Sequence, residues 1–450
     1  MLLLLMCLLW RENSLLPETM SRLYSEAVKY IFKRKADISQ EEIAKFVIEI
    51  GKIALHGLLS PDQRLFFKES DFEKSMLAMA VRVGILTQQR VLKGIDTHNS
   101  VQFIHETFQE FSAARYMQSL FVTDTEEFEK TLDEIVPKHH EGFEYLLRFC
   151  CGDNVPCTDK ILKVFQERYQ KDLSVHSRVG RLALHCHFEG QSKSLPSEEF
   201  IHAFVIGVII IPYLDNDSMN SFTYCLKHVA DQTKDQGNVY FAKVHSLNVR
   251  SCDLKRHSAD LEHSISAMTN LQALTLFGCL LTATNVAHIV SSLKSATSLT
   301  KLCLLRSPLG GSAATWAGHL KHLIHIEKLV LCSCMWTGED MNHIAKSLRD
   351  MSNLVELDLS DNNSLGGTAA AWSEMFKHLK SLQKLDLGRC KLTGDDLSHI
   401  AKSLRDLVHF VELDLLENDQ LGHNPSFWSI QLKQLKHLQR LDLRLCALTD

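Results

Sequence analysis

The stretch LVELDLSDNNSL, residues 354–365, spaces its leucines in an order that returns along the chain. Matching stretches begin at residues 244, 271, 299, 326, 382, 410 and 438, so that successive copies lie 27 or 28 residues apart. The copies follow the pattern L-x-x-L-x-L-x-x-N/C-x-L closely. A fixed period with one short apolar segment per copy predicts stacked structural units rather than a single globular core.

This pattern is typical of the leucine-rich repeat, in which each copy adds a strand to the inner face of a horseshoe and a helix to its outer face. A longer period overlies it, because TGEDMNHIAKSLRDM (337–351) and TGDDLSHIAKSLRDL (393–407) lie two repeats apart. Copies with Cys279, Cys334, Cys390 and Cys446 alternate with copies with Ser307, Asn362 and Asn418. This double unit resembles ribonuclease inhibitor. We expect these Cys and Asn side chains to face inward and bond backbone groups that would otherwise be unpaired.

Before residue 240 the pattern is helical. The segment 39–59 opens with a capping box, Ser39 to Glu42, and continues with apolar residues at helical spacing. FEYLLRFCCG (143–152) predicts a helix that ends at Gly152. Pro61 predicts the first turn of a further helix, and VGILTQQRV (83–91) predicts a small strand wing.

FIHETFQEFSAARYM, residues 103–117, predicts a helix because its apolar residues step by three or four. The segment is similar to the winged-helix signature of animal NOD-like receptors, F-x-H-x-[ST]-F-Q-E-[FY]-x-A-A. LLRFCCG and LALHCHFEG resemble the second helical domain that precedes the repeats in these receptors. The resemblance therefore covers nearly the whole chain in the family's order. It implies the end of a NACHT-associated helical domain over 1–18, a winged helix over 19–125, a second helical domain over 126–240 and ribonuclease-inhibitor-type repeats over 241–450.

The predicted fold class is an α-helical amino-terminal half followed by an α/β leucine-rich-repeat solenoid. The apolar start MLLLLMCLLW has its arginine after the apolar run and no small-residue cleavage site, so we expect a buried helix there rather than a secretory signal. The last repeat stops in mid-unit without a polar cap, and we expect the chain to be a fragment at both ends. We also expect self-association or fraying at LQRLDL (438–443).

The resemblance also implies a role for His105, which matches the winged-helix histidine that contacts the phosphates of ADP in inactive receptors. An alternative is a surface histidine paired with Glu106 or Glu110. The sequence contains no G-x-x-x-x-G-K-[ST], and its one Gly-Lys pair is Gly51–Lys52, so no loop is expected to cradle phosphates. We therefore expect no cofactor in this chain, although the intact family uses ADP and ATP. The purified protein is expected to bind ATP or ADP weakly or not at all and to hydrolyse neither.

Composition excludes several classes of function. A formal charge of −5 on 450 residues does not favour nucleic acid or an anionic membrane as a partner. The 13 cysteines have no disulfide-framework spacing and suit reduced thiols in the cytoplasm. HCH (185–187) and HH (139–140) lack a second cluster at ligand spacing, so no metal is expected. No catalytic motif is present, which predicts a protein that is not an enzyme.

The resemblance implies a non-catalytic cytosolic protein of the NOD-like receptor class, a pattern-recognition or signalling regulator of innate immunity. Its repeats would bind a protein partner, or a microbial or danger ligand, on their concave face. The alternative is a stand-alone leucine-rich-repeat binding module or inhibitor that resembles ribonuclease inhibitor.

The predicted partner-binding surface follows from aspartates that recur every 28 residues. The residues between the strand leucines point to the concave face, where Asp358, Asp386, Asp414 and Asp442 form a column and flanking charges alternate in sign. An alternative is that these aspartates are solvated and offset by neighbouring basic residues. Under the binding hypothesis, reversal of Glu412 and Glu417 slows association, whereas Lys346→Glu on the helical side matters little. The predicted surface consists of Glu356, Asp358, Lys384, Asp386, Arg389, Glu412, Asp414, Glu417, Arg440 and Asp442.

Overall fold

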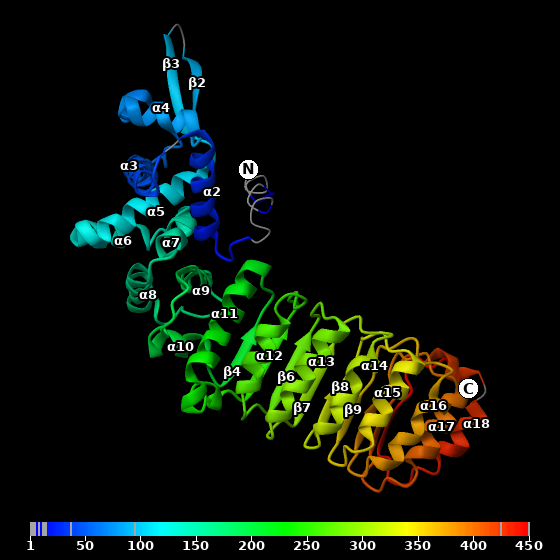
Figure 1. Ribbon diagram of the computed structural model, residues 1–450. Coiled ribbons are helices and arrows are strands. Elements are labelled where there is room, and N and C mark those ends of the chain that lie inside the picture. Colours follow the sequence, from blue (N-terminus) through cyan, green and yellow to red (C-terminus); the bar gives the residue numbers. More distant parts are fainter. Residues whose placement is uncertain are drawn as a thin grey trace. The chain divides into compact units, whose positions relative to one another are not determined.

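A computed structural model of the chain describes residues 6–7, 10, 16–36, 38–93, 96–423 and 425–448. The chain divides into two compact units, residues 1–200 and 201–450. The first unit is mainly helical, and the second contains a parallel sheet of nine described strands (Figure 1). The predicted fold class is therefore confirmed. The helix expected over residues 1–10 falls largely outside the described residues.

The first unit is a set of packed helices with one three-stranded sheet. The sheet has the order β1-β3-β2, with antiparallel pairs. Its elements are α2 (Met20–Lys35), α3 (Gln40–Leu59), β1 (Phe66–Lys68), α4 (Lys74–Val83), β2 (Leu86–Lys93), β3 (Asp96–Phe103), α5 (Glu106–Thr123), α6 (Thr125–Ile135), α7 (Glu144–Cys151), α8 (Val155–Tyr169), α9 (Arg178–Gly190) and α10 (Glu198–Phe204), which continues into the second unit.

Local signals set most of these boundaries. Helix α3 begins with the predicted capping box between Ser39 and Glu42, and α7 ends at Gly152 as predicted. The strand wing expected near residues 83–91 is the hairpin of β2 and β3. The helix expected at Pro61 is wrong. Ser60 instead donates through its N–H and hydroxyl to the carbonyl of Gly57, which closes a turn that leads into β1.

Helix α5 starts at Glu106, three residues after the predicted start. The reason is that the N–H of Ile104 donates to the carbonyl of Ile85 and so extends the β2–β3 hairpin. Helices α3 and α5 then pack closely at Gly51, where an added Cβ would lie 2.1 Å from the carbonyl oxygen of Ser112. A glycine is required here because two helix backbones approach each other.

A buried carboxylate fixes the start of α2 against α9. The side chain of Glu189 is fully buried and accepts hydrogen bonds from the backbone N–H groups of Met20 and Ser21, at 3.1 and 2.9 Å. The Arg148 guanidinium lies 3.5 Å away and supplies the opposite charge. A negative charge at a helix start satisfies unpaired N–H groups and interacts favourably with the helix dipole.

The second unit is the repeat solenoid. Its strands form one parallel sheet in the order β12-β11-β10-β9-β8-β7-β6-β5-β4. The strands are β4 (Val208–Ile211), β5 (Ser246–Arg250), β6 (Ala273–Phe277), β7 (Lys301–Leu305), β8 (Lys328–Val330), β9 (Glu356–Asp358), β10 (Lys384–Asp386), β11 (Glu412–Asp414) and β12 (Arg440–Asp442). The helices are α11 (Asn216–Thr233), α12 (Ser258–Ala267), α13 (Ala283–Ser292), α14 (Ala313–Trp316), α15 (Gly338–Leu348), α16 (Ala369–Trp372), α17 (Gly394–Leu404) and α18 (Pro425–Leu432).

The sheet begins earlier than the sequence indicated. Strand β4 pairs in parallel with β5 and is joined to it through α11, although the region before residue 240 was expected to be helical. The run VIII is short, and period alone does not separate a four-residue apolar strand from a helix segment. The eight predicted repeat strands, β5–β12, follow it in register.

The Cys and Asn positions face inward as predicted. Asn362 is fully buried, and its Oδ1 accepts from the N–H groups of Cys334 and Trp336 at 3.0 and 3.2 Å. Asn418 repeats these contacts one double unit later. The thiol of Cys334 donates to the carbonyl of Leu304 at 3.3 Å. These side chains therefore pair backbone groups that the short strands leave open.

The double period comes from two kinds of helix. Helices α15 and α17 each begin with a Thr–Asp capping box, whereas α14 and α16, which precede them in the alternating repeats, are single turns that continue as 3-10 helix. The carboxylate of Asp340 also accepts from the N–H groups of Gly311 and Ala313 in the preceding repeat, at 2.8 and 3.0 Å. Each cap thus joins one repeat to the one before it.

Candidate functional site

His105 lies at the start of α5 and closes its first turn. Its Nδ1 accepts a hydrogen bond from the N–H of Thr107 at 3.2 Å and lies 2.9 Å from the Thr107 hydroxyl. That hydroxyl also contacts the hydroxyl of Tyr24. Within the described part of the chain, neither Glu106 nor Glu110 forms an ion pair with His105. Burial raises the pKa of the Glu110 carboxyl to about 8, and the negative charge of Glu106 adds to this increase.

The residues present do not form a nucleotide site around His105. One ring nitrogen is occupied by helix capping, and the sequence offers no glycine-rich phosphate loop. A single remaining imidazole nitrogen gives one hydrogen bond, whereas a phosphate site needs several converging donors. The ADP contact at His105 stays a prediction that the family resemblance alone supports.

The concave face is built by strand alternation. In β9–β11 the central leucine is 1% exposed, while the residues on either side of it are exposed or half-buried. The parallel register places equivalent residues of successive repeats beside each other, so each strand position becomes a column across the sheet. The four aspartates Asp358, Asp386, Asp414 and Asp442 lie in one such column, as the sequence predicted.

The first column alternates in charge and its members are ion-paired. It runs Lys328, Glu356, Lys384, Glu412 and Arg440 over β8 to β12. The nitrogen–oxygen distances between successive neighbours are 2.5, 3.7, 3.7 and 3.4 Å. Lys328 lowers the pKa of Glu356 through its hydrogen bond. Pairing across the strands therefore offsets much of the charge in this column.

A second set of pairs lies in the turns that follow the strands. Arg389 donates to Glu417 through two nitrogens, at 2.8 and 2.9 Å, and lies 3.6 Å from Asp361. All three residues adopt a left-handed backbone, with φ between 55° and 57°. This conformation turns the chain out of the strand and aligns the three side chains along one rim of the face.

The aspartate column has a structural role that the sequence did not predict. Each of its carboxylates accepts a hydrogen bond from the N–H two residues later, as in Asp386 to Gly388 at 2.9 Å. Such bonds stabilise the turn after the strand. Burial, aided by the carboxylates of Asp358 and Asp414, raises the pKa of Asp386 to about 6 against the effect of the Gly388 hydrogen bond. The column therefore retains unfavourable negative charge at neutral pH.

The earlier repeats hold functional candidates that the sequence analysis missed. A hollow of about 530 Å³ lies over β5–β9, with Phe277, Leu305 and Val330 among its lining residues. Lys301 and Lys328 also line it. Lys301, Lys328 and Val330 occupy the same columns as predicted residues, so the 28-residue register identifies them once every copy is compared. Phe277 and Leu305 lie beside each other in a further column that the prediction did not include.

The two halves of the face differ in charge. We define the basic half as segments 246–251, 273–278, 301–306 and 328–333, and the acidic half as segments 356–361, 384–389, 412–417 and 440–445. Within these described segments the basic half carries four cations and no carboxylate, namely Arg250, Lys301, Arg306 and Lys328. The acidic half carries eight carboxylates and four cations. The face therefore has a formal charge of +4 on one half and −4 on the other.

Other chemistry is limited in the described part of the chain. No group of three or more His, Cys, Asp or Glu residues there is arranged to hold a metal ion. The cysteines are unpaired, and burial raises the pKa of Cys334 and Cys390 to about 12. Among the helices that the structure describes, none combines the length and apolar character needed to span a bilayer.

Comparison with known proteins identifies relatives of nearly the whole chain and of parts of it. NLR family CARD domain-containing protein 4 from Xenopus tropicalis is 24% identical over 462 residues, which cover 95% of this chain and 44% of that protein. NACHT, LRR and PYD domains-containing protein 14 from Mus musculus is 31% identical over 186 residues, 40% of this chain and 19% of that protein. Ribonuclease inhibitor from Sus scrofa is 32% identical over 152 residues, 33% of this chain and 33% of that protein.

Two family models, both described as Leucine Rich Repeat, match the chain. One matches residues 381–403, and the other matches residues 350–371 and 434–450. The chain spans less than half the length of the curated relatives it matches. The predicted relationship to NOD-like receptors with ribonuclease-inhibitor-like repeats is confirmed by these matches.

Proposed function

We propose that this chain is the recognition region of a cytoplasmic, non-catalytic protein of the NOD-like receptor type that acts in innate immunity. In this proposal the concave face binds a macromolecular ligand, most simply a protein. The observation that carries the proposal is the opposite charge of the basic and acidic halves, side by side on one continuous sheet. Relatives named for NLR and LRR domains support the class of protein.

The proposed partner has a complementary distribution of charge. Its acidic surface lies over the basic half and its basic surface over the acidic half. The hollow beside Phe277 and Leu305 accepts an apolar anchor. The Arg306 guanidinium stacks 5.2 Å from the centre of the Phe277 ring and keeps a positive charge beside this hollow. Charges so arranged steer encounter and set the orientation of the partner.

The test removes charge without removing hydrogen-bond acceptors. The double variant Asp358→Asn, Asp414→Asn keeps an amide oxygen that accepts from the turn N–H groups. It is preferred to reversal of Glu412, which would also break the ion pairs of Glu412 with Lys384 and Arg440. The matched control is Lys346→Gln with Lys402→Gln, on the exposed sides of α15 and α17. We expect the Asn pair to slow association with a captured partner and to weaken its salt dependence, while the control leaves both unchanged.

Unchanged association rates for the Asn pair and for Lys301→Gln, with the fold intact by circular dichroism, would place the binding surface elsewhere. A second candidate function is a stand-alone inhibitor, because the chain is 32% identical to ribonuclease inhibitor over 152 residues. Stoichiometric loss of ribonuclease activity on addition of the chain would favour this second function, and full activity would favour the first.

A further inference from the structure

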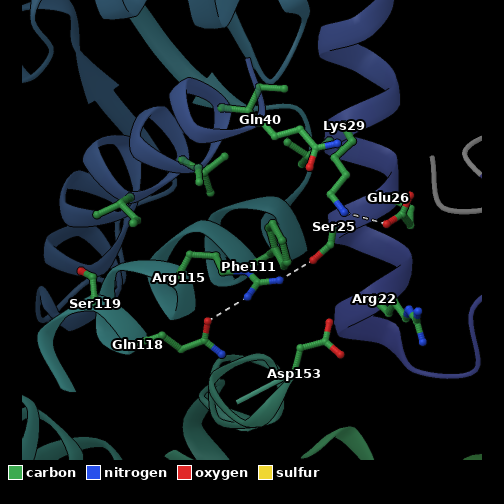
Figure 2. A pocket seen from close by; sticks show the side chains of 15 residues that line it. Arg22, Ser25, Glu26, Lys29, Gln40, Phe111, Arg115, Gln118, Ser119 and Asp153 are labelled. Carbon is green, nitrogen blue, oxygen red and sulfur yellow. Dashed lines mark hydrogen bonds and ion pairs between the residues drawn. The ribbon is translucent and has the colours of Figure 1, made fainter. Parts of the chain in front are cut away.

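A cavity in the first unit lies apart from the repeats and from His105. It has a volume of about 720 Å³, within the range of small-molecule sites. Helices α2, α3 and α5 and the turn after α7 supply its lining (Figure 2). Val28, Ile43, Val47 and Phe111 line its apolar part and belong to the packed core of the unit.

One cation dominates the polar side of this cavity. Figure 2 shows the guanidinium of Arg115 between α2 and α5, where it donates to Gln118 Oε1 at 2.9 Å and to the hydroxyl of Ser25. Both acceptors are neutral, and no carboxylate of the described residues is ion-paired with Arg115. The guanidinium also lies 5.2 Å from the centre of the Phe111 ring. Burial lowers the pKa of Arg115, against the attraction of Asp153.

The other charges of the lining leave a small positive excess. The lining contains three cations, Arg22, Lys29 and Arg115, and two carboxylates, Glu26 and Asp153. Lys29 and Glu26 pair with each other at 2.8 Å. Arg22 and Arg115 then remain against the single carboxylate of Asp153, so the lining as a whole is short of one negative charge.

The geometry points to a binding site for a small amphipathic carboxylate, whose acid group bonds to Arg115 and whose apolar body lies on Ile43, Val47 and Phe111. A guanidinium has five N–H donors, and two are used by Ser25 and Gln118, so three remain for a carboxylate. An excess of one positive charge matches a monoanion better than a phosphate dianion. This site is independent of the proposed function of the repeats.

The test uses three probes of equal chain length, octanoate, 1-octanol and octylammonium, titrated into the 450-residue protein by calorimetry. We expect octanoate to bind about tenfold more tightly than 1-octanol, because a charge-assisted hydrogen bond is added. Octylammonium should not bind. Arg115→Met should reduce the affinity for octanoate to that for 1-octanol and leave 1-octanol unchanged. The matched control is Arg168→Met, which removes an exposed arginine that pairs with Asp133 on the same unit.

A second variant keeps the test decisive if Arg115→Met does not fold. Ala44 is exposed and lines the cavity, so Ala44→Phe blocks the cavity without changing the core and should abolish binding of octanoate. Equal affinity for octanoate and 1-octanol, undiminished binding by Ala44→Phe, or no binding of octanoate to the natural protein would each overturn the proposal.

Discussion

Removal of the Asn362 side chain should destabilise the middle of the repeats. Asn362→Ala leaves the N–H groups of Cys334 and Trp336 without an acceptor, because Asn362 Oδ1 is the acceptor that the structure shows for both. The three carbonyls that accept from the Asn362 amide group each accept a second hydrogen bond, which the variant leaves in place. The second donors are Trp336 Nε1 to the carbonyl of Leu331, Cys390 Sγ to that of Leu359 and the Ser333 N–H to that of Ser360. Two orphaned buried N–H groups, at about 1–3 kcal/mol each, give an expected loss of about 2–6 kcal/mol in the free energy of unfolding.

The assay compares Asn362→Ala with Asn353→Ala, which lies at the end of the preceding repeat. Asn353 is exposed and makes one bond, from its amide to the carbonyl of Ile324 at 3.0 Å, so its loss should cost no more than about 1 kcal/mol. Urea denaturation gives the change in stability. Hydrogen exchange at the amides of Cys334 and Trp336 reports it locally, because repeat proteins can unfold in parts.

A further variant separates acceptor loss from loss of volume. Asn362→Cys introduces the residue found 28 positions away at Cys334 and Cys390, but a thiol is only a weak acceptor. We expect it to recover little of the loss. The reasoning is refuted if Asn362→Ala matches Asn353→Ala within 1 kcal/mol, or if both amides remain as protected as in the natural protein.

Three other substitutions test single contacts. Asp386→Asn should remove a pH dependence of the free energy of unfolding. The folded protein raises the pKa of Asp386 to about 6 and so binds this proton more tightly than the unfolded chain does. The free energy of unfolding of the natural protein therefore falls as the pH rises through that value. Urea midpoints at about pH 5 and about pH 8 should differ more for the natural protein than for the variant. Gly51→Ala should lower the melting temperature of the first unit, because its Cβ would meet the carbonyl of Ser112, whereas Gly318→Ala, in open space, should not. Glu189→Ala should cost about 3–5 kcal/mol and expose the first amides of α2 to exchange, because a buried ion pair loses one partner; protection equal to that of the natural protein would contradict this role.

The candidate surface was only half visible in the sequence. The aspartate column and its alternating neighbours were predicted, because a 28-residue period places equivalent residues on adjacent strands. The basic half was missed, since Arg250, Lys301, Arg306 and Lys328 do not recur as one residue type. The cavity beside Arg115 has no sequence pattern, because its lining comes from segments up to about 130 residues apart.

The sequence by itself determined the repeats, the helical first unit, the capping box of α3 and the inward Cys and Asn positions, because period and local hydrogen bonding act over a few residues or one repeat. Only the tertiary structure decided what depends on distant partners. A turn forms at Ser60, where Pro61 had predicted the start of a helix, because the Ser60 hydroxyl donates a hydrogen bond to the carbonyl of Gly57. Strand β4 formed because β5 was there to pair with it. Whether the carboxylates of the face repel or pair depended on distances of 2.5–3.7 Å between side chains, which no spacing along the chain specifies.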